Sequence, residues 1–434
     1  MPRTKKSILL VVLALVFLCA GSLLVPAVRD RVAWRVDELT TRIYFALHPP
    51  EQAVFVPQDQ VAKVVQLTIQ AMTPDPTIGP TATPEALAAA DTAVPGPSVT
   101  PLPANVNLPG IHYFNQHFGF NMCAPSNLAM SLSFWGWPGK PQDIAPVVKP
   151  FEQDKNVMPY ELAAYVEQQT NFGALVRYGG TPELLKSVLA AGFPVLIEKG
   201  VYFPEAATGK VSWMGHYNVV NGYDDGAQVF IVQDSFLSDG VNYQVPVDTL
   251  VQSWRSFDFV FLVIYPKEKQ ADLFAALGDY ADEQKSDHLA VDIAARDIAS
   301  LSGVDQFFAY FNRGTSLVHL QDYKGAADAY DEAFKIYAIL AEVDKRPYRM
   351  TWYQTGPYYA YFFNGRYQDV INLTNITLES TNQPYLEENY YWRARAEAAL
   401  GKLDEAKKDL KSSLKYHVDF SPSLDLMLQL GISN

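Results

Sequence analysis

The sequence predicts a multi-domain chain in which an α+β domain is followed by an all-α domain of helical repeats, with a transmembrane helix at the N-terminus. Its length of 434 residues exceeds what one domain usually holds. Three patterns support this division. An apolar run opens the chain, helix patterns precede strand patterns between residues 110 and 267, and a spaced pattern of small and aromatic residues recurs between 268 and 434.

The apolar run from Ser7 to Val28 holds 22 uncharged residues, enough to cross a bilayer as a helix. Arg3, Lys5 and Lys6 precede it, which favours an N-terminus on the inner side. We therefore expect residues 1–28 to be an uncleaved, single-pass anchor in the cell membrane, with the rest of the chain outside. A secretory signal peptide is the alternative, although its apolar core is normally only about 7–15 residues long.

Two connecting regions follow the anchor. Residues 29–72 contain an apolar repeat at helical spacing that predicts a short stalk helix, formed by Val32, Val36, Leu39, Ile43 and Leu47. Residues 73–109 are rich in Pro, Thr and Ala and contain no Lys or Arg. Such a segment neither buries a core nor continues a helix, so we expect a semi-extended linker.

Residues 110–267 are dense in aromatic side chains and carry the α+β pattern. Helix patterns begin after Cys123 and span about 159–169 and 182–191, and strand-like runs follow at 193–197, 216–223, 227–236 and 257–265. Helices first and strands later predict a domain in which the two are segregated rather than alternating.

Residues 268–434 are helical and repetitive. Two segments place small and large residues at mutual offsets of 9, 3, 4 and 3: Gly314, Tyr323, Ala326, Tyr330 and Ala333 in the first, and Ala394, Leu403, Ala406, Leu410 and Ser413 in the second. A middle copy keeps Gly365 and Tyr367 but has Val370 where the small residue belongs. The pattern resembles the tetratricopeptide (TPR) repeat, whose concave surface would present a site for a protein partner. An irregular helical bundle is the alternative.

Charge and motif content exclude several functions. The chain has 47 acidic and 34 basic side chains, a formal charge of −13, which argues against a nucleic-acid partner. His112 and His117 flank Gln116, but no second thiol or carboxylate cluster completes a metal set, so we expect no metal or other cofactor. No phosphate-binding G-x-x-x-x-G-K-[ST] loop occurs in the sequence.

Cys123 is the only cysteine outside the apolar run, and it precedes Ala124-Pro125 and an apolar helix pattern. Because proline is well tolerated in the first turn of a helix, Cys123 should lie at the N-terminus of a buried helix. There the free N–H groups and the helix dipole favour a negatively charged group, as a nucleophilic thiol requires. The alternative is a small buried hydrophobe, a common role of cysteine.

A second candidate group lies in the hairpin from His216 to Ser235. Asp224-Asp225-Gly226 predicts a three-residue turn with Gly226 in the left-handed conformation, which places Tyr223 opposite Ala227. His216 then lies directly opposite Asp234, where a carboxylate can hold one imidazole nitrogen and leave the other for a thiol. A buried, structural His–Asp pair would fit the same pattern.

Gln116 supplies the fourth part, because its amide can donate a hydrogen bond to an oxyanion together with the N–H of Cys123. A loop glutamine is by itself more often solvated. Together, however, Gln116, Cys123, His216 and Asp234 are the groups that a cysteine acyl-transfer site needs.

These residues, with the blocks AGFPVLIE (191–198) and GHYNVVNGYDD (215–225), resemble the papain-like bacteriocin-processing (double-glycine) peptidase superfamily, in its stand-alone bacterial branch with no attached transporter. The resemblance covers about residues 110–266. It implies that Cys123 is the nucleophile, His216 the general base and acid, Asp234 the group that orients the imidazole, and Gln116 the oxyanion donor. Two departures stand out: Ala124 replaces the usual glycine, and Gln116 lies seven rather than six residues before the cysteine.

The sequence therefore predicts a membrane-anchored, extracytoplasmic cysteine peptidase that hydrolyses peptide bonds of a peptide or protein substrate. The alternative is a catalytically inactive papain-like scaffold that binds peptides and acts with its TPR-like repeats in protein–protein interaction.

Overall fold

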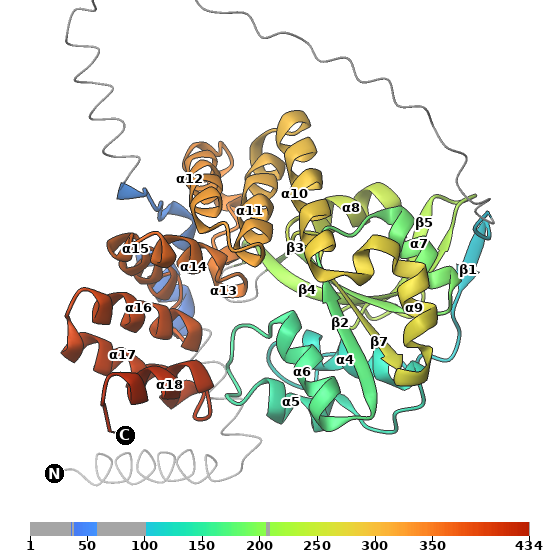
Figure 1. Cartoon of the computed structure of the whole chain (residues 1–434), viewed down its shortest axis with the longest axis horizontal. Helices are drawn as coiled ribbons and strands as arrows, with labels where there is room; N and C mark the ends of the chain where they lie inside the picture. Colours follow the sequence, from blue (N-terminus) through green and yellow to red (C-terminus); the bar gives the residue numbers. More distant parts are fainter. Residues whose placement is uncertain (1–35, 37–38, 59–100, 205–208, 434) are drawn as a thin grey trace, which may run out of the picture.

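The computed structural model describes residue 36 and residues 39–58, 101–204 and 209–433 (Figure 1). The predicted anchor and most of the predicted linker lie outside these residues. Within the described part of the chain, no helix is both long and apolar enough to span a bilayer. The predicted stalk helix is present over residues 39–47. The end of the predicted linker is not a free spacer, because residues 105–107 join a sheet.

A seven-stranded antiparallel sheet forms the centre of the α+β domain, in the order β2-β7-β3-β4-β5-β6, and β1 pairs with the end of β4. The strands are β1 Asn105–Asn107, β2 Phe172–Arg177, β3 Val195–Pro204, β4 Val211–Asp224, β5 Val229–Gln233, β6 Tyr243–Pro246 and β7 Phe261–Pro266. β4 is the longest strand and lies between β3 and β5, so it carries side chains from the middle of the domain outward to its end.

Helices cover both faces of this sheet (Figure 1). The first layer contains α4 Cys123–Phe134, α5 Pro141–Val148 and α6 Pro159–Gln169, and the second contains α7 Pro182–Ala190, α8 Val247–Arg255 and α9 Gln270–Leu277. Strand side chains alternate between the layers: Leu196 packs with the first, whereas Val195 and Ile197 pack with the second. The sheet is therefore buried on both sides, which fixes its register.

The predicted helices at 123, 159–169 and 182–191 are confirmed within one residue at their ends, and each predicted strand run overlaps a strand. Sequence reasoning missed β2, β6, α5 and α8. These elements are short, between four and nine residues long.

The predicted hairpin geometry between β4 and β5 is wrong. Asp224 pairs with Val229 and Tyr223 with Phe230, so the connection is longer than three residues. Gln228, with φ 54°, takes the left-handed conformation that was expected at Gly226. The register then shifts by one residue between Val220 and Gly222 through a β-bulge.

The C-terminal region is built from helices that pack in successive pairs. Its helices are α10 Glu283–Ser300, α11 Gly303–His319, α12 Tyr323–Ile339, α13 Met350–Tyr353, α14 Gly356–Phe363, α15 Tyr367–Glu379, α16 Glu387–Ala399, α17 Leu403–Tyr416 and α18 Ser421–Gln429. The predicted small residues lie where helices meet: a Cβ added at Gly314 would come within 2.6 Å of the Tyr330 ring. Ala394, Ala406 and Leu410 pack together in the last pair.

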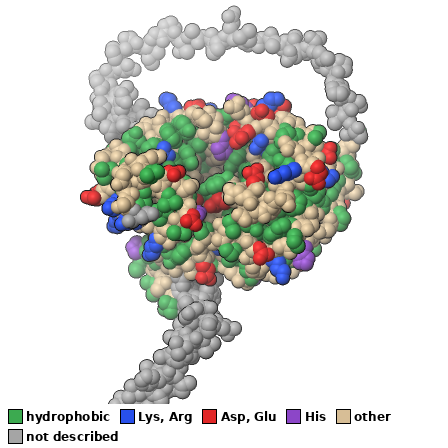
Figure 2. Space-filling view, turned by 60° about the horizontal axis from the view of Figure 1, so that its bottom comes forward, with side chains coloured by type: hydrophobic (Ala, Val, Ile, Leu, Met, Phe, Trp, Pro, Cys, Tyr) green, Lys and Arg blue, Asp and Glu red, His purple; other side chains and the backbone are tan. Residues whose placement is uncertain are grey.

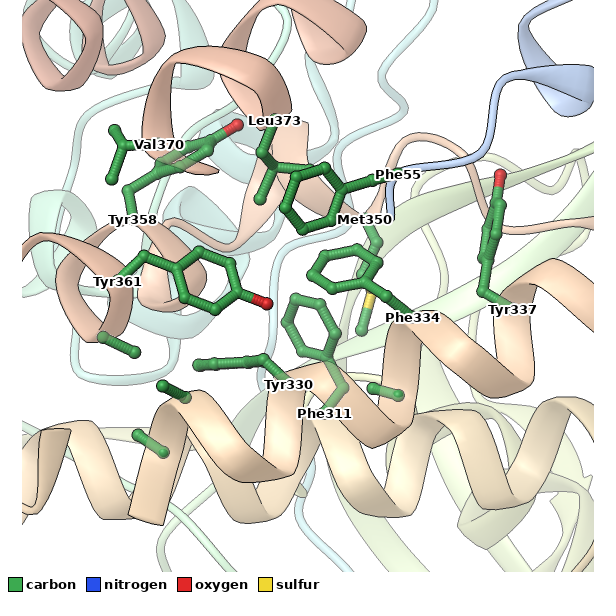
Figure 3. Close-up of a cluster of buried hydrophobic side chains, with 14 of the residues drawn as sticks. Phe55, Phe311, Tyr330, Phe334, Tyr337, Met350, Tyr358, Tyr361, Val370 and Leu373 are labelled. Carbon is green, nitrogen blue, oxygen red and sulfur yellow. The ribbon is translucent and has the colours of Figure 1, made fainter. Parts of the chain in front are cut away.

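Aromatic side chains fill the centre of this helical region (Figure 3). Phe55, from the segment that follows the stalk helix, inserts among them, with its ring centroid 5.0 Å from that of Phe334 and 5.8 Å from that of Tyr361. The N–H of Gln58 donates to Asp369 at 2.9 Å. The segment after residue 48 is therefore part of the helical core rather than a separate stalk.

The α+β domain and the helical region share one hydrophobic core. Trp213 of β4 and Phe257 before β7 pack with Phe308 of α11 and Tyr353 of α13, at ring centroid distances of 5.7–6.0 Å. Leu273 and Leu277 of α9 pack into the core of the α+β domain, although they lie after the predicted boundary at 267. The packing surface of residues 110–267 therefore continues into the helical region.

Buried hydrogen bonds reinforce this contact, and Asn312 makes two of them. Its Nδ2 donates to the carbonyl of Arg255 at 2.7 Å, and its Oδ1 accepts from the N–H of Asp258 at 3.2 Å. Because Asn312 is 1% exposed, Asn312→Ala should leave buried backbone groups unsatisfied and lower the free energy of unfolding by about 1–3 kcal/mol. Denaturant unfolding of the full chain measures this loss.

Asn364→Ala is the matched control, because Asn364 also donates to a backbone carbonyl, that of Tyr323, but is exposed. We expect it to change stability by less than about 1 kcal/mol. Equal losses in the two variants would contradict the structural role assigned to Asn312.

Candidate active site

Cys123 is the first residue of α4, as predicted from Pro125. Leu128 and Leu132 of this helix are fully buried, so the helix is held rigidly against the sheet. The N–H of Cys123 lies in the first turn, where no helical carbonyl accepts it, and is available to a bound group. Ala124 is 2% exposed and packs into the core, which accommodates the methyl group that distinguishes it from glycine.

His216 and Asp234 contact each other even though the predicted register is wrong. His216 Nε2 lies 2.8 Å from Asp234 Oδ1. With Val219 opposite Gln233, extension of the ladder would place Asn218 opposite Asp234, so His216 is diagonal to Asp234 rather than directly across from it. The longer turn alone would have put His216 and Asp234 on opposite faces of the sheet. The bulge shifts the pairing by one more residue, so both side chains lie on one face.

The Asp234 carboxylate is held by more than the histidine. Its Oδ1 also accepts from the N–H of Phe236 at 3.0 Å, and its Oδ2 lies 3.8 Å from Nζ of the buried Lys199. A tight loop orients the residue, with Asp234 N–H donating to the carbonyl of Gly240 at 2.9 Å. Glycine is required there, because a Cβ at 240 would lie 1.9 Å from the Asp234 carbonyl oxygen.

Both members of the pair, His216 and Asp234, are charged. Burial alone would lower the pKa of His216, but the charge and hydrogen bond of Asp234, together with the neighbouring Cys123 thiol, raise it to about 9. Burial alone would raise the pKa of Asp234, but His216, Lys199 and the Phe236 N–H hold it below its usual range. Since Asp234 bonds Nε2, the other ring nitrogen, Nδ1, is left for the thiol.

Gln116 is positioned by two polar side chains that sequence reasoning missed. Ser235 Oγ donates to Gln116 Oε1 at 2.8 Å, and Asn127 Nδ2 donates to Ser235 Oγ at 2.9 Å. Asn127 Nδ2 also donates to the carbonyl of Cys123 at 2.9 Å. The amide oxygen of Gln116 is thereby occupied, and its NH₂ group is the part that can donate to a ligand.

Gln116, Cys123 and His216 line one cleft of about 620 Å³, with Asp234 directly behind the histidine. Figure 2 shows the molecular surface, which is hollowed near the middle of the face turned forward. Lys149, Asp154, Glu198, Phe203 and Tyr353 also contribute to the wall of the cleft. Tyr353 comes from the helical region, and no local sequence signal could have placed it here. Within the described residues, no group of three His, Cys, Asp or Glu side chains is arranged to hold a metal.

The charged pair predicts how stability depends on pH. The contribution of His216, whose pKa rises from 6.5 to about 9 on folding, is complete below about pH 6.5 and is lost as the pH rises towards 9. The contribution of Asp234, whose pKa falls, is present above about pH 4 and is lost on acidification. The stability difference between the unmodified chain and Asp234→Asn should therefore be largest near pH 5–6 and shrink by pH 9. A difference that is constant from pH 5 to 9 in chemical unfolding would contradict this.

Comparison with known proteins finds similarity in the α+β domain. Residues 109–261 match the Peptidase_C39 like family. No curated protein matches the chain. A structure from Bacillus anthracis described as a C39-like peptidase is 18% identical, covers 37% of this chain and 96% of its own, and has a TM-score of 0.30. Xylellain, a cysteine protease from Xylella fastidiosa, is 17% identical, covers 38% of this chain and 87% of its own, and has a TM-score of 0.27. At these TM-scores the sequence match alone identifies the domain: residues 109–261 form a papain-like α+β domain of the C39-like peptidase type.

Proposed function

We propose that the chain is a cysteine peptidase that hydrolyses peptide bonds at Cys123. The observation that carries this proposal is that Gln116, Cys123 and His216 line one cleft while Asp234 bonds the far nitrogen of His216 at 2.8 Å. A structural His–Asp pair would require neither a thiol beside the free ring nitrogen nor an amide donor fixed across the same cleft.

In the proposed reaction, the Cys123 sulfur attacks the carbonyl carbon of the scissile bond, and His216 holds the proton of the thiol. The carbonyl oxygen becomes an oxyanion, which accepts hydrogen bonds from Gln116 and the Cys123 N–H. The C–N bond breaks as His216 gives its proton to the leaving amine. Water then attacks the thioester with His216 as base, which releases the acid and restores the thiol. Asp234 keeps the imidazole oriented throughout and stabilises the imidazolium each time it forms.

A thiol-directed peptidase probe, such as a peptidyl acyloxymethyl ketone, tests this function on the full chain at pH 7. The chain should be labelled at Cys123, and Cys123→Ala should abolish labelling. Gln116→Ala should lower turnover of a peptide mixture by about 10²–10³-fold, as the loss of one oxyanion donor does elsewhere. Gln383→Ala, in the helical region, is the matched control and should retain turnover.

Ser235→Ala should have a smaller effect of about tenfold, because Ser235 positions Gln116 without touching substrate. The lower activity of Ser235→Ala should appear in kcat rather than in KM. If Cys123 is alkylated no faster than a free thiol and His216→Ala does not change that rate, the chain is instead a peptide-binding scaffold.

We also propose that the enzyme is held at the outer side of the cell membrane by residues 1–28, since Ser7 to Val28 is apolar and follows basic residues. The paired helices of the C-terminal region are proposed to be TPR-like, because Gly314, Ala394 and Ala406 lie at close helix contacts. Such repeats would offer a site for a protein partner.

N-terminal sequencing of the membrane-bound protein tests the anchor and should find residues before Ser7. On cells whose outer layers have been removed but whose cell membrane is intact, added protease should cleave the part of the chain that follows residue 28. A mature chain that begins after Gly21 would refute the anchor and support secretion.

A further inference from the structure

A second groove of about 1050 Å³ lies next to the catalytic cleft, between the α+β domain and the helical region. Glu198 and Tyr353 line both cavities, so the two lie side by side and share a wall. One wall comes from α6 and β3, and the other from α11, α12 and α14. A peptide bound across Cys123 would therefore lie next to a space that the peptidase domain does not form alone.

The groove contains an acid without a counter-charge. Glu198, on β3, is 5% exposed, and its neighbour Lys199 points to the opposite face and pairs with Asp234. Among the described residues, no Lys, Arg or His forms an ion pair with Glu198. Its polar neighbour is the Tyr217 hydroxyl, which donates to the carbonyl of Val157 at 2.8 Å. Burial raises the pKa of Glu198 well above its usual range, as expected for a carboxyl group that lacks a cation, and a cation bound beside it would favour the ionised form.

The remaining walls favour a positive charge. No Lys or Arg lines the groove within the described residues, whereas aromatic rings are frequent: Tyr160, Tyr178, Phe257, Tyr323, Tyr353 and Tyr359. Burial, followed by the charges of Asp258, Glu198 and Asp287, raises the pKa of Tyr178. The one histidine, His319, lies 3.2 Å from Asp287 Oδ1, which balances its charge if it is protonated.

The catalytic cleft itself differs in charge. Lys149 and Lys155 line it together with Asp154 and Glu198, so it holds charges of both signs, whereas no Lys or Arg lines the groove among the described residues. A cationic substrate group is disfavoured near these two lysines and favoured in the groove, where a carboxyl group and aromatic faces are available.

We infer that this interdomain groove is a specificity subsite for an arginine or lysine side chain of the peptide substrate, with Glu198 as its anionic partner and the tyrosine rings as its walls. The inference rests on the proposed peptidase function for the identity of the ligand. It assigns the helical region a part in substrate recognition, because Tyr323, Tyr353 and Tyr359 all belong to that region.

The test measures binding without turnover, on the full-length chain carrying Cys123→Ala. Fluorescent alanine hexapeptides with a single arginine at each position in turn are compared with matched peptides that carry citrulline, the neutral isostere. At one position, arginine should bind about tenfold more tightly than citrulline. Adding Glu198→Gln should reduce that ratio to about one, whereas Glu332→Gln, at an exposed acid outside the groove, should leave it unchanged.

A second variant keeps the test decisive if Glu198→Gln fails to fold. Tyr359 is 38% exposed in the groove, and Tyr359→Leu should lower the arginine preference severalfold. Tyr243→Leu, at a residue of similar exposure on β6, is the control and should leave the arginine preference unchanged. An arginine-to-citrulline ratio near one at every position, or a preference that both groove variants leave intact, overturns the subsite.

The two proposals fail in different ways. If Cys123 reacts with the peptidase probe but arginine is not preferred, the groove assignment is wrong and the peptidase stands. If arginine is preferred in a Glu198-dependent manner but Cys123 is unreactive, the groove is supported as a binding site and the peptidase is refuted.

Discussion

The buried pair formed by His216 and Asp234 is the interaction on which the site depends. Two opposite charges inside a protein are stable only when each is fully compensated, because desolvation costs several kcal/mol per ion. Here the compensation comes from Lys199 on the neighbouring strand and from the Phe236 N–H. The bulge in β4 and the tight loop closed at Gly240 bring these groups together. Distortion of either element would leave a buried charge without its partner.

The helical region contributes to the same site through a shared core rather than through a tether. Trp213 precedes His216 on β4, and its ring packs against Phe308 and Tyr353 of the helical region. Because close-packed cores transmit small shifts, a change in the helical pairs would reach the strand that carries the histidine. The helical region is thus placed to affect both the shape of the cleft and the ligands that it admits.

Sequence reasoning located each candidate side chain but misjudged how two of them meet. The start of α4 at Cys123 follows from local chemistry, since Pro125 fits only the first turn. The His216–Asp234 contact was expected from a three-residue turn, and it arises instead from a longer turn and a bulge. Two departures from ideal pairing offset one another, which no local rule could have foreseen. Ser235 and Asn127 were missed because a hydroxyl and an amide gain their role only from what lies beside them.

The sequence by itself determined the elements whose signals are local: the helix starts, the apolar strand runs, the spacing of small residues at Gly314 and Ala406, and the types of residue that could perform thiol chemistry. Only the tertiary structure decided which residues share a cavity. Glu198 and Tyr353 lie 155 positions apart in the numbering and line the same two hollows. The reason is physical: side-chain chemistry and helix propensity act over a few residues, whereas burial, charge compensation and the union of two cores depend on contacts between distant segments that form only when the whole chain folds.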